Sequence, residues 1–199
     1  MKIELKKQKK KAALMQAAYT LFLKQGTENT SVGDITTAAG VAKGTFYLYF
    51  RDKQDIVTAV IVVLSRQILE EAYLKMCAVR TGDFAEDMTL LANALLDFLA
   101  DNKPLLGFIE RGFRWPAFRE RMNAAGNPVW QSLRNDLRLQ AERTGKDEEE
   151  LIRRVYCLVS MCGSVAYSSI MRGEPEDLSR LRPVICGIIR DSLRAEAAE

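Results

Sequence analysis

Histidine is missing from this chain of 199 residues. Its absence excludes a Ser-His-Asp or Cys-His catalytic set and an H-E-x-x-H zinc site. It also removes the side chain that most often moves protons near neutral pH. Enzymes without histidine exist, so the absence lowers the expectation of catalysis without excluding it.

Cysteine is scarce as well, with four residues and no C-x-x-C pair. We expect reduced and mostly buried thiols, with redox sensing by one of them as the open alternative. A glycine-rich phosphate loop is also lacking, and residues 148–150, three glutamates, indicate the acidic first turn of a helix rather than a metal site. We therefore expect no cofactor. The cysteines are Cys77, Cys157, Cys162 and Cys186.

Long apolar runs are absent too, because the longest purely apolar stretch near the middle covers only residues 59–64. A membrane helix needs about 20 apolar residues. The basic N-terminus is not followed by the apolar core of a signal peptide. We therefore expect a cytoplasmic protein without a membrane partner.

The net charge of +3 hides an uneven distribution. Residues 1–53 hold ten Lys or Arg against four Asp or Glu, a net of +6, whereas residues 54–199 hold nineteen against twenty-two, a net of −3. Most of the basic excess comes from the lysines between Lys6 and Lys11. A basic arm on a small N-terminal unit is typical of a protein that binds a polyanion. Such a flexible arm would enter the minor groove of DNA, and a solubilising tail is the alternative.

The chain shows helical periodicity almost throughout and no strand-like alternation with hairpin turns. The pattern predicts an all-α fold with nine or ten helices. Serine, threonine and aspartate stand where helices are expected to begin, and glycine where several end. The expected helices cover about residues 14–24, 31–39, 42–50, 53–77, 84–99, 103–109, 129–143, 147–171 and 178–195.

The short helices expected at 31–39 and 42–50 are joined by a tight turn at Gly40, as in a helix-turn-helix. Such a unit places its second helix in the major groove of DNA. Gly44 lacks a side chain, so the backbone can approach a phosphate closely there. The inner, core-facing residues are Ala39, Val41, Phe46 and Phe50, and the outer, DNA-facing residues are Lys43, Thr45, Tyr47 and Tyr49.

The stretch from Thr30 to Lys53, TSVGDITTAAGVAKGTFYLYFRDK, resembles the signature of TetR/AcrR-type transcriptional regulators. The resemblance implies a homodimer with a helix-turn-helix DNA-binding domain at 1–53 and a larger helical ligand-binding and dimerisation domain at 54–199. It implies a regulator, usually a repressor, that binds a palindromic operator in double-stranded DNA. Because no catalytic set of residues converges in the sequence, we do not expect an enzyme. Carried over by position, the DNA contacts are Thr30, Ser31, Lys43, Gly44, Thr45, Tyr47, Tyr49 and Lys53.

The second segment is rich in aromatic and methionine side chains. A pocket of this composition suits a small apolar or aromatic effector, although each of these residues is alternatively plain core. Glu110, Arg111 and Arg114 would orient the effector, or form a solvated face. The predicted ligand-binding residues are Phe98, Phe108, Trp115, Trp130, Tyr156 and Tyr167.

The last two expected helices carry small and aliphatic residues typical of a dimer surface. Two helices from each subunit would make a four-helix bundle, which is also the family pattern. Effector binding would then move the helix at 53–77 and change the spacing of the two recognition helices. Two alternatives remain: a DNA-binding regulator controlled by a protein partner or by cysteine oxidation, and a helical adaptor that does not bind DNA.

Overall fold

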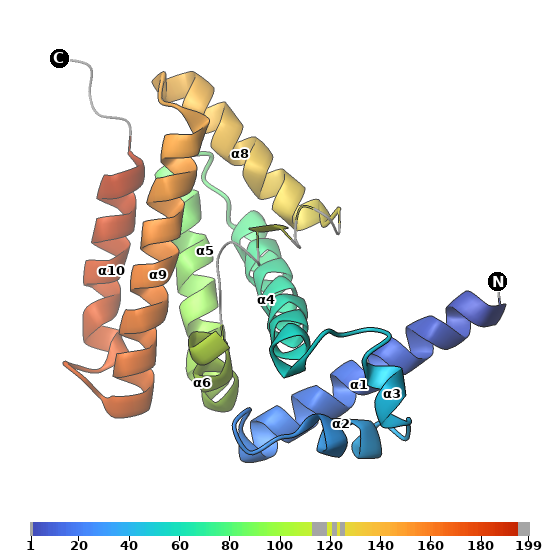
Figure 1. Ribbon diagram of the computed structural model, residues 1–199. Helices are drawn as coiled ribbons and strands as arrows, with labels where there is room; N and C mark the ends of the chain where they lie inside the picture. Colours follow the sequence, from blue (N-terminus) through green and yellow to red (C-terminus); the bar gives the residue numbers. More distant parts are fainter. Residues whose placement is uncertain (1, 113–118, 121–122, 124–125, 195–199) are drawn as a thin grey trace.

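The computed structural model describes residues 2–112, 119–120, 123 and 126–194. Within these ranges the only regular elements are helices, nine of which have defined bounds, and the predicted all-α fold is confirmed (Figure 1). No helix in these ranges is long and apolar enough to cross a membrane. The helices are α1 (Lys2–Gln25), α2 (Val32–Ala38), α3 (Lys43–Phe46), α4 (Lys53–Ala78), α5 (Phe84–Asp101), α6 (Lys103–Gly112), α8 (Pro128–Thr144), α9 (Glu148–Arg172) and α10 (Leu178–Leu193).

The N-terminal lysines are helical, which corrects the expectation of a flexible arm. α1 runs without interruption from Lys2 to Gln25, and the side chains from Lys6 to Lys11 are all exposed. Lysine and alanine are good helix formers, and no glycine or proline interrupts this stretch. The basic residues are therefore fixed along a helix whose N-terminal turns project beyond α2 and α3 (Figure 1).

The second helix of the helix-turn-helix is shorter than predicted. α3 ends at Phe46, not at Phe50. Hydrogen-bonded turns then continue the chain: the Tyr49 N–H donates to the Phe46 carbonyl at 2.9 Å, and the Phe50 N–H donates to the same carbonyl at 3.0 Å. These turns continue the helical path of the chain to residue 50, so Phe46 and Phe50 both reach the core.

One hydrophobic cluster joins the helix-turn-helix to the rest of the chain. It contains buried residues from α1, α2, α3 and α4, together with Leu105 and Phe108 of α6. The rings of Phe22 in α1 and Phe108 stack with their centroids 5.6 Å apart. The predicted boundary at residue 53 therefore follows the change in charge, whereas the packing is continuous across it.

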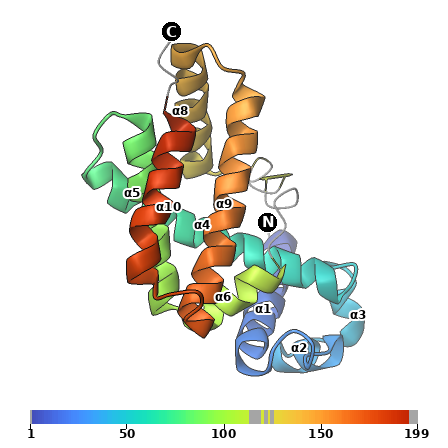
Figure 2. The same cartoon turned by 90° about the vertical axis from the view of Figure 1, so that its left-hand side faces the viewer.

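A second cluster holds the C-terminal helices together. Buried side chains of α5, α8, α9 and α10 form it, and α9 and α10 lie side by side in both views (Figure 2). Arginines of α10 fasten that helix to α5, with Arg182 2.6 Å from Asp97 and Arg190 2.6 Å from Glu86. One face of α10 is thereby fixed inward, and the other is left on the surface.

Candidate DNA interface and effector cavity

The outer surface of the helix-turn-helix carries most of the residues that the sequence assigned to DNA. Lys43 and Gly44 are exposed, Thr45 is half-buried, and Tyr47 is 55% exposed. The Tyr47 ring packs edge-on against the buried ring of Phe46, with centroids 5.3 Å apart, so the core holds it in place. Tyr49 is half-buried and packs against the core.

Gly44 has no structural reason to be glycine. Its backbone is not among the positive-φ glycines of the described chain, and a Cβ added there would meet nothing within 4 Å. Glycine also weakens a helix relative to alanine by roughly 0.5–1 kcal/mol. The residue therefore leaves bare backbone on the outer surface at a cost to the local helix.

Thr30 and Ser31 serve the start of α2. The Ser31 hydroxyl accepts the Asp34 N–H at 3.1 Å, and the Asp34 carboxylate accepts the Ser31 N–H at 2.8 Å, which completes a capping box. These bonds hold the pKa of Asp34 below its usual value, the Ser31 backbone bond being the larger cause. Ser31 stays exposed, but its hydroxyl donates to the Asp34 carboxylate at 2.7 Å, so the predicted phosphate contact requires this hydroxyl to leave Asp34.

Thr30 is placed differently from the sequence prediction. It is 1% exposed, and its hydroxyl donates to the Gly26 carbonyl at 2.7 Å. A buried hydroxyl engaged in this way has no route to a phosphate, so the predicted contact by its side chain is corrected. The residue closes the turn between α1 and α2.

Lys53 ties two elements of the interface together. It begins α4, whose N-cap Asp52 accepts the Asp55 N–H at 2.8 Å. The half-buried Lys53 side chain reaches back so that its Nζ donates to the Thr27 carbonyl at 3.1 Å. This lysine therefore positions the start of α4 against the α1–α2 turn, and its charge lies at the edge of the proposed DNA face.

Sequence reasoning missed Leu48. Its side chain is 79% exposed, the largest fraction among the exposed large hydrophobic residues of the described chain. The outer face was expected to be polar or aromatic, so an aliphatic residue between two tyrosines drew no attention. The signal was available in residues 46–50, FYLYF: Phe46 and Phe50 are four residues apart and share the core face of a helical turn, so Leu48 between them faces outward.

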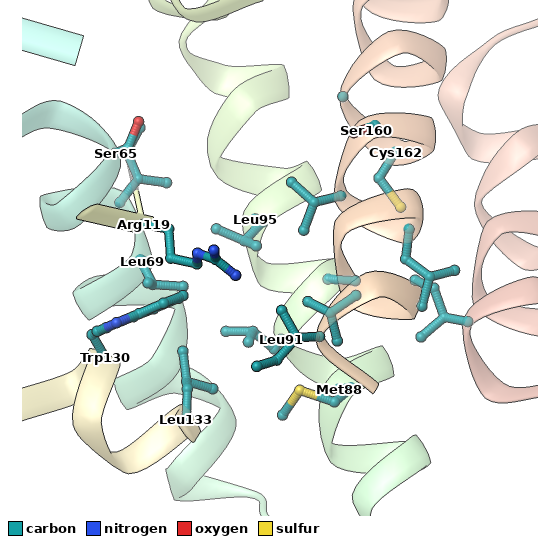
Figure 3. Close-up of a pocket in the computed structure, with 18 of the residues that line it drawn as sticks. Ser65, Leu69, Met88, Leu91, Leu95, Arg119, Trp130, Leu133, Ser160 and Cys162 are labelled. Atoms are coloured by element: carbon teal, nitrogen blue, oxygen red, sulfur yellow. The ribbon is translucent and has the colours of Figure 1, made fainter. Parts of the chain in front are cut away.

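A cavity of about 660 Å³ lies among the C-terminal helices. It is bounded by α4, α5, α6, α8, α9 and α10, and side chains of α5 stand between those of α4 and α9 (Figure 3). This volume is within the range of small-molecule sites, roughly 300–1,000 Å³. Its aliphatic residues include Leu69, Met88, Leu91, Leu95, Leu96, Leu99, Leu106, Ile109, Leu133, Ile152 and Val155.

The predicted aromatic ligand contacts separate into different places. Trp130 lines the cavity. Phe98 and Phe108 instead belong to the cluster beneath the helix-turn-helix, Tyr156 is on the surface, and Tyr167 lies beneath the Arg172 guanidinium. Trp115 lies outside the described residues. The cavity wall is thus mainly aliphatic, because the helical spacing turns most of these rings elsewhere.

Charged groups also line the cavity. Arg119 extends between α4 and α5 (Figure 3) and is 4.0 Å from the Glu149 carboxylate. Arg134 is 3.8 Å from Glu148. Of the residues expected to orient an effector, Glu110 lines the cavity, whereas the Arg111 side chain and Arg114 lie outside the described residues. The arrangement offers both a guanidinium and carboxylates to a polar head group.

Trp130 and its neighbour Asn127 connect the cavity to α4. The Asn127 Oδ1 accepts the Trp130 N–H at 2.8 Å and so caps α8, while its Nδ2 donates to Glu70 of α4. The Trp130 indole N–H donates to Asn123 at 2.6 Å. Asn127 therefore links the first turn of α8, which carries Trp130, to α4.

The cysteines are less buried than the sequence suggested. Cys77 and Cys157 are exposed, and Cys162 and Cys186 are half-buried. Exposed positions at helix surfaces cost a small thiol little, so burial was not required. At Cys162, which lines the cavity, burial raises the pKa to about 11, so the reactive thiolate is disfavoured there.

Apolar side chains lie open on the surface of α9 and α10. Tyr156 and Met171 of α9 and Val184 and Ile188 of α10 are all exposed. Small residues accompany them, with Ser160 and Ser164 exposed on α9. An apolar surface on two neighbouring antiparallel helices is typical of an interface.

Comparisons with known proteins relate the N-terminal part of the chain to one family of regulatory proteins. Residues 14–60 match the family model of bacterial regulatory proteins of the tetR family. The chain is 39% identical over 70 residues to the HTH-type transcriptional regulator AcrR of Shigella flexneri, which covers 35% of this chain but only 32% of that protein.

Solved structures extend the similarity to the whole fold. A protein described as a TetR-family transcription regulator from Shewanella sp. PV-4 has a TM-score of 0.66 at 19% identity, covering 92% of this chain and 97% of the other. Thermus thermophilus FadR, solved with lauroyl-CoA, has a TM-score of 0.62 at 19% identity and covers 94% and 96%. At such identities the likeness concerns the fold.

Proposed function

Because the chain belongs to the TetR family of helix-turn-helix transcriptional regulators, we propose that it represses transcription from a palindromic operator and leaves it when an apolar effector fills the cavity. The observation that carries the proposal is the outward-facing Lys43, Gly44 and Tyr47 on a helix-turn-helix whose core continues into cavity-lining α6. Affinity would come from phosphate contacts and specificity from contacts to base edges.

Charge supports the DNA part of this proposal. The net of +6 over residues 1–53 coincides with the exposed surface of α1, α2 and α3. Lys43 and Tyr47 supply an ammonium group and a hydroxyl to the duplex, and the Ser31 hydroxyl would join them by exchanging its bond to Asp34 for one to a phosphate. Phosphate contacts of this kind make affinity fall steeply as salt rises.

The cavity supports an effector with an aliphatic chain. Its wall is built mainly from leucine, isoleucine, valine and methionine, with Trp130 as the one aromatic side chain among the described lining residues. Arg119 would hold an anionic head group. The likeness to an acyl-CoA-bound FadR fold is consistent with this class, so we narrow the expected effector to an acyl chain with an acidic head.

The route from cavity to operator runs along α4. Ile68 and Leu69 of α4 line the cavity, while Ile56 and Val60 of the same helix lie in the cluster beneath the helix-turn-helix. An effector that binds better to one orientation of α4 shifts the population toward it. Two recognition elements fit successive major-groove faces only at a spacing of about 34–36 Å, so a small rotation of α4 is sufficient for release.

Dimerisation would use the exposed face of α9 and α10. Val184 and Ile188 stand on α10 opposite the arginines that fasten it to α5. Gly187 between them allows close approach of a second helix. A palindromic operator requires two copies of the chain related by a two-fold axis, and a self-complementary face of this kind would create such a two-fold dimer.

The test uses fluorescence anisotropy with a duplex that the full chain selects from a random-sequence pool. We expect saturable binding that weakens with salt, and release by lauroyl-CoA or dodecanoate. Leu95→Trp should fill the cavity and keep DNA binding while abolishing release, whereas Leu74→Trp, on the exposed surface of α4, should behave as the parent chain. Release from Leu95→Trp at parental effector concentrations would contradict the cavity assignment.

The alternatives give different results in the same assay. A chain with all four cysteines changed to serine should bind and release DNA normally, and loss of its response would favour control by cysteine oxidation. A helical adaptor would select no duplex at all. In that case Tyr47→Ala would leave its activity intact.

A further inference from the structure

We propose that Leu48 reads the C5-methyl group of a thymine in each operator half-site. The inference rests on the proposed DNA-binding function and adds a specificity determinant to it. Its starting observation is the 79% exposure of an aliphatic side chain on the outer surface of the helix-turn-helix. Solvent exposure of a leucine there contributes nothing to the fold.

The backbone fixes where Leu48 points. Its N–H donates to the Thr45 carbonyl at 3.3 Å, so the residue continues the turn of α3. Residues four apart lie on the same face of a helical turn, which places Leu48 one turn beyond Gly44. With no side chain at Gly44 and nothing within 4 Å of where its Cβ would stand, this face can enter a groove deeply and bring Leu48 to the base edges.

Chemistry then selects the partner. Leucine neither donates nor accepts a hydrogen bond, so it gains nothing from a phosphate. In the major groove the thymine methyl is the apolar group on a base edge. Lys43 and Tyr47 flank Leu48 with polar groups suited to the backbone, so the same surface supplies positioning contacts around one apolar reading contact.

The expected size of the effect follows from the area that one methyl buries. Burial of a CH₂ or CH₃ group contributes about 0.8 kcal/mol, which corresponds to about fourfold in affinity. A symmetrical loss in both half-sites multiplies to about fifteenfold. The contact is thus large enough to measure and small enough to leave binding intact when it is removed.

The experiment replaces each thymine of the selected duplex, one symmetrical pair at a time, with deoxyuridine. This change removes only the methyl group, and a synthetic duplex carries C5-methyl groups only on thymine. We expect one pair whose replacement weakens binding of the parent chain about fifteenfold. In the Leu48→Ala chain the same replacement should change affinity by less than about twofold.

A matched control is Leu74→Ala, which shortens another exposed leucine, 67% exposed, far along α4. This chain should keep the full sensitivity to uracil, and circular dichroism should show all three chains equally folded. If the parent binds the duplex but no thymine pair is sensitive, or if Leu48→Ala keeps the parental sensitivity, the inference is overturned while the proposed function stands.

Other contacts of Leu48 would give different outcomes in these experiments. If a second copy of the chain covers the residue, Leu48→Ala changes the oligomeric state in sedimentation experiments and leaves the uracil effect unchanged. Failure of the parent chain to select any duplex overturns both the inference and the proposed function. Each outcome therefore separates the reading contact from the binding activity on which it rests.

Discussion

The stacked rings of Phe22 and Phe108 join the cavity-lining α6 to α1, which packs against the helix-turn-helix, and their removal should be costly. Phe108 is 3% exposed, and its centroid lies 5.6 Å from that of Phe22. Phenylalanine to alanine changes in a core cost about 3–5 kcal/mol. We expect this loss for Phe108→Ala in urea unfolding followed by circular dichroism, with about 0.5–1.5 kcal/mol of it belonging to the ring pair itself.

A milder change isolates the functional part of the same contact. Phe108→Leu keeps most of the volume and should cost less than about 1.5 kcal/mol, yet it removes one ring from the only described stacked pair between α1 and α6. Leu106 and Ile109 on either side line the cavity. We therefore expect parental operator affinity in Phe108→Leu and a reduced release by the effector.

Two results would refute this reasoning. If Phe108→Ala costs less than about 1 kcal/mol, α6 is not anchored to α1 as the structure indicates. If Phe108→Leu releases DNA at the parental effector concentration, coupling runs through α4 alone. A double-mutant cycle with Phe22→Leu measures the ring pair directly, and Leu151→Ala, in the other cluster, is the control for general destabilisation.

Further predictions concern the fold and its coupling to DNA. Gly44→Ala should stabilise the chain by about 0.5–1 kcal/mol in urea unfolding, because a Cβ has free space there, yet weaken operator binding by anisotropy. Asn127→Ala should cost about 1 kcal/mol through loss of the α8 cap and blunt effector-induced release, since the hydrogen bond from Asn127 to Glu70 of α4 is lost; unchanged release would contradict the route through α8. Stability should stay level from about pH 5 to 8 because histidine is absent. It should fall below about pH 4, since the pKa values of Asp34 and Asp87 are lowered and their contribution is lost as pH drops through the folded values. Burial alone would raise the pKa of Asp87, but the hydrogen bonds from Thr81 and Arg80 outweigh burial and lower it. Asp87→Asn should therefore cost about 2–3 kcal/mol and reduce the loss of stability below pH 4. An unchanged loss of stability at low pH would assign that loss to other carboxylates.

The sequence predicted the elements well where local chemistry decides them. Caps at Ser31 and Asp52 begin helices as side-chain acceptors should, and Gly145 and Gly173 end helices with positive φ. These signals depend on a few adjacent residues. They are therefore readable without knowledge of the packing.

The cavity was harder to predict, because it depends on which side of each helix meets which neighbour. Phe108 is of a residue type common in ligand pockets, but its position on α6 directs its ring toward Phe22. Leucines such as Leu91 and Leu95 look like ordinary core in the sequence, yet they line the cavity. Thr30 was misplaced for the same reason, since its burial follows from the contact of α1 with α2 rather than from its own type.

The lysines of α1 have a consequence for how quickly the protein finds its site. Successive residues turn by about 100° in a helix, so Lys6, Lys7, Lys9, Lys10 and Lys11 spread over more than half of its circumference. Such a helix attracts a phosphate backbone in many orientations about its axis, but it does not recognise base sequence. The Debye length in physiological salt is about 8 Å, shorter than the roughly 36 Å length of this helix. Its charge should therefore act chiefly on short-range sliding along non-operator DNA, shortening the search while leaving the lifetime of the final complex to the recognition surface.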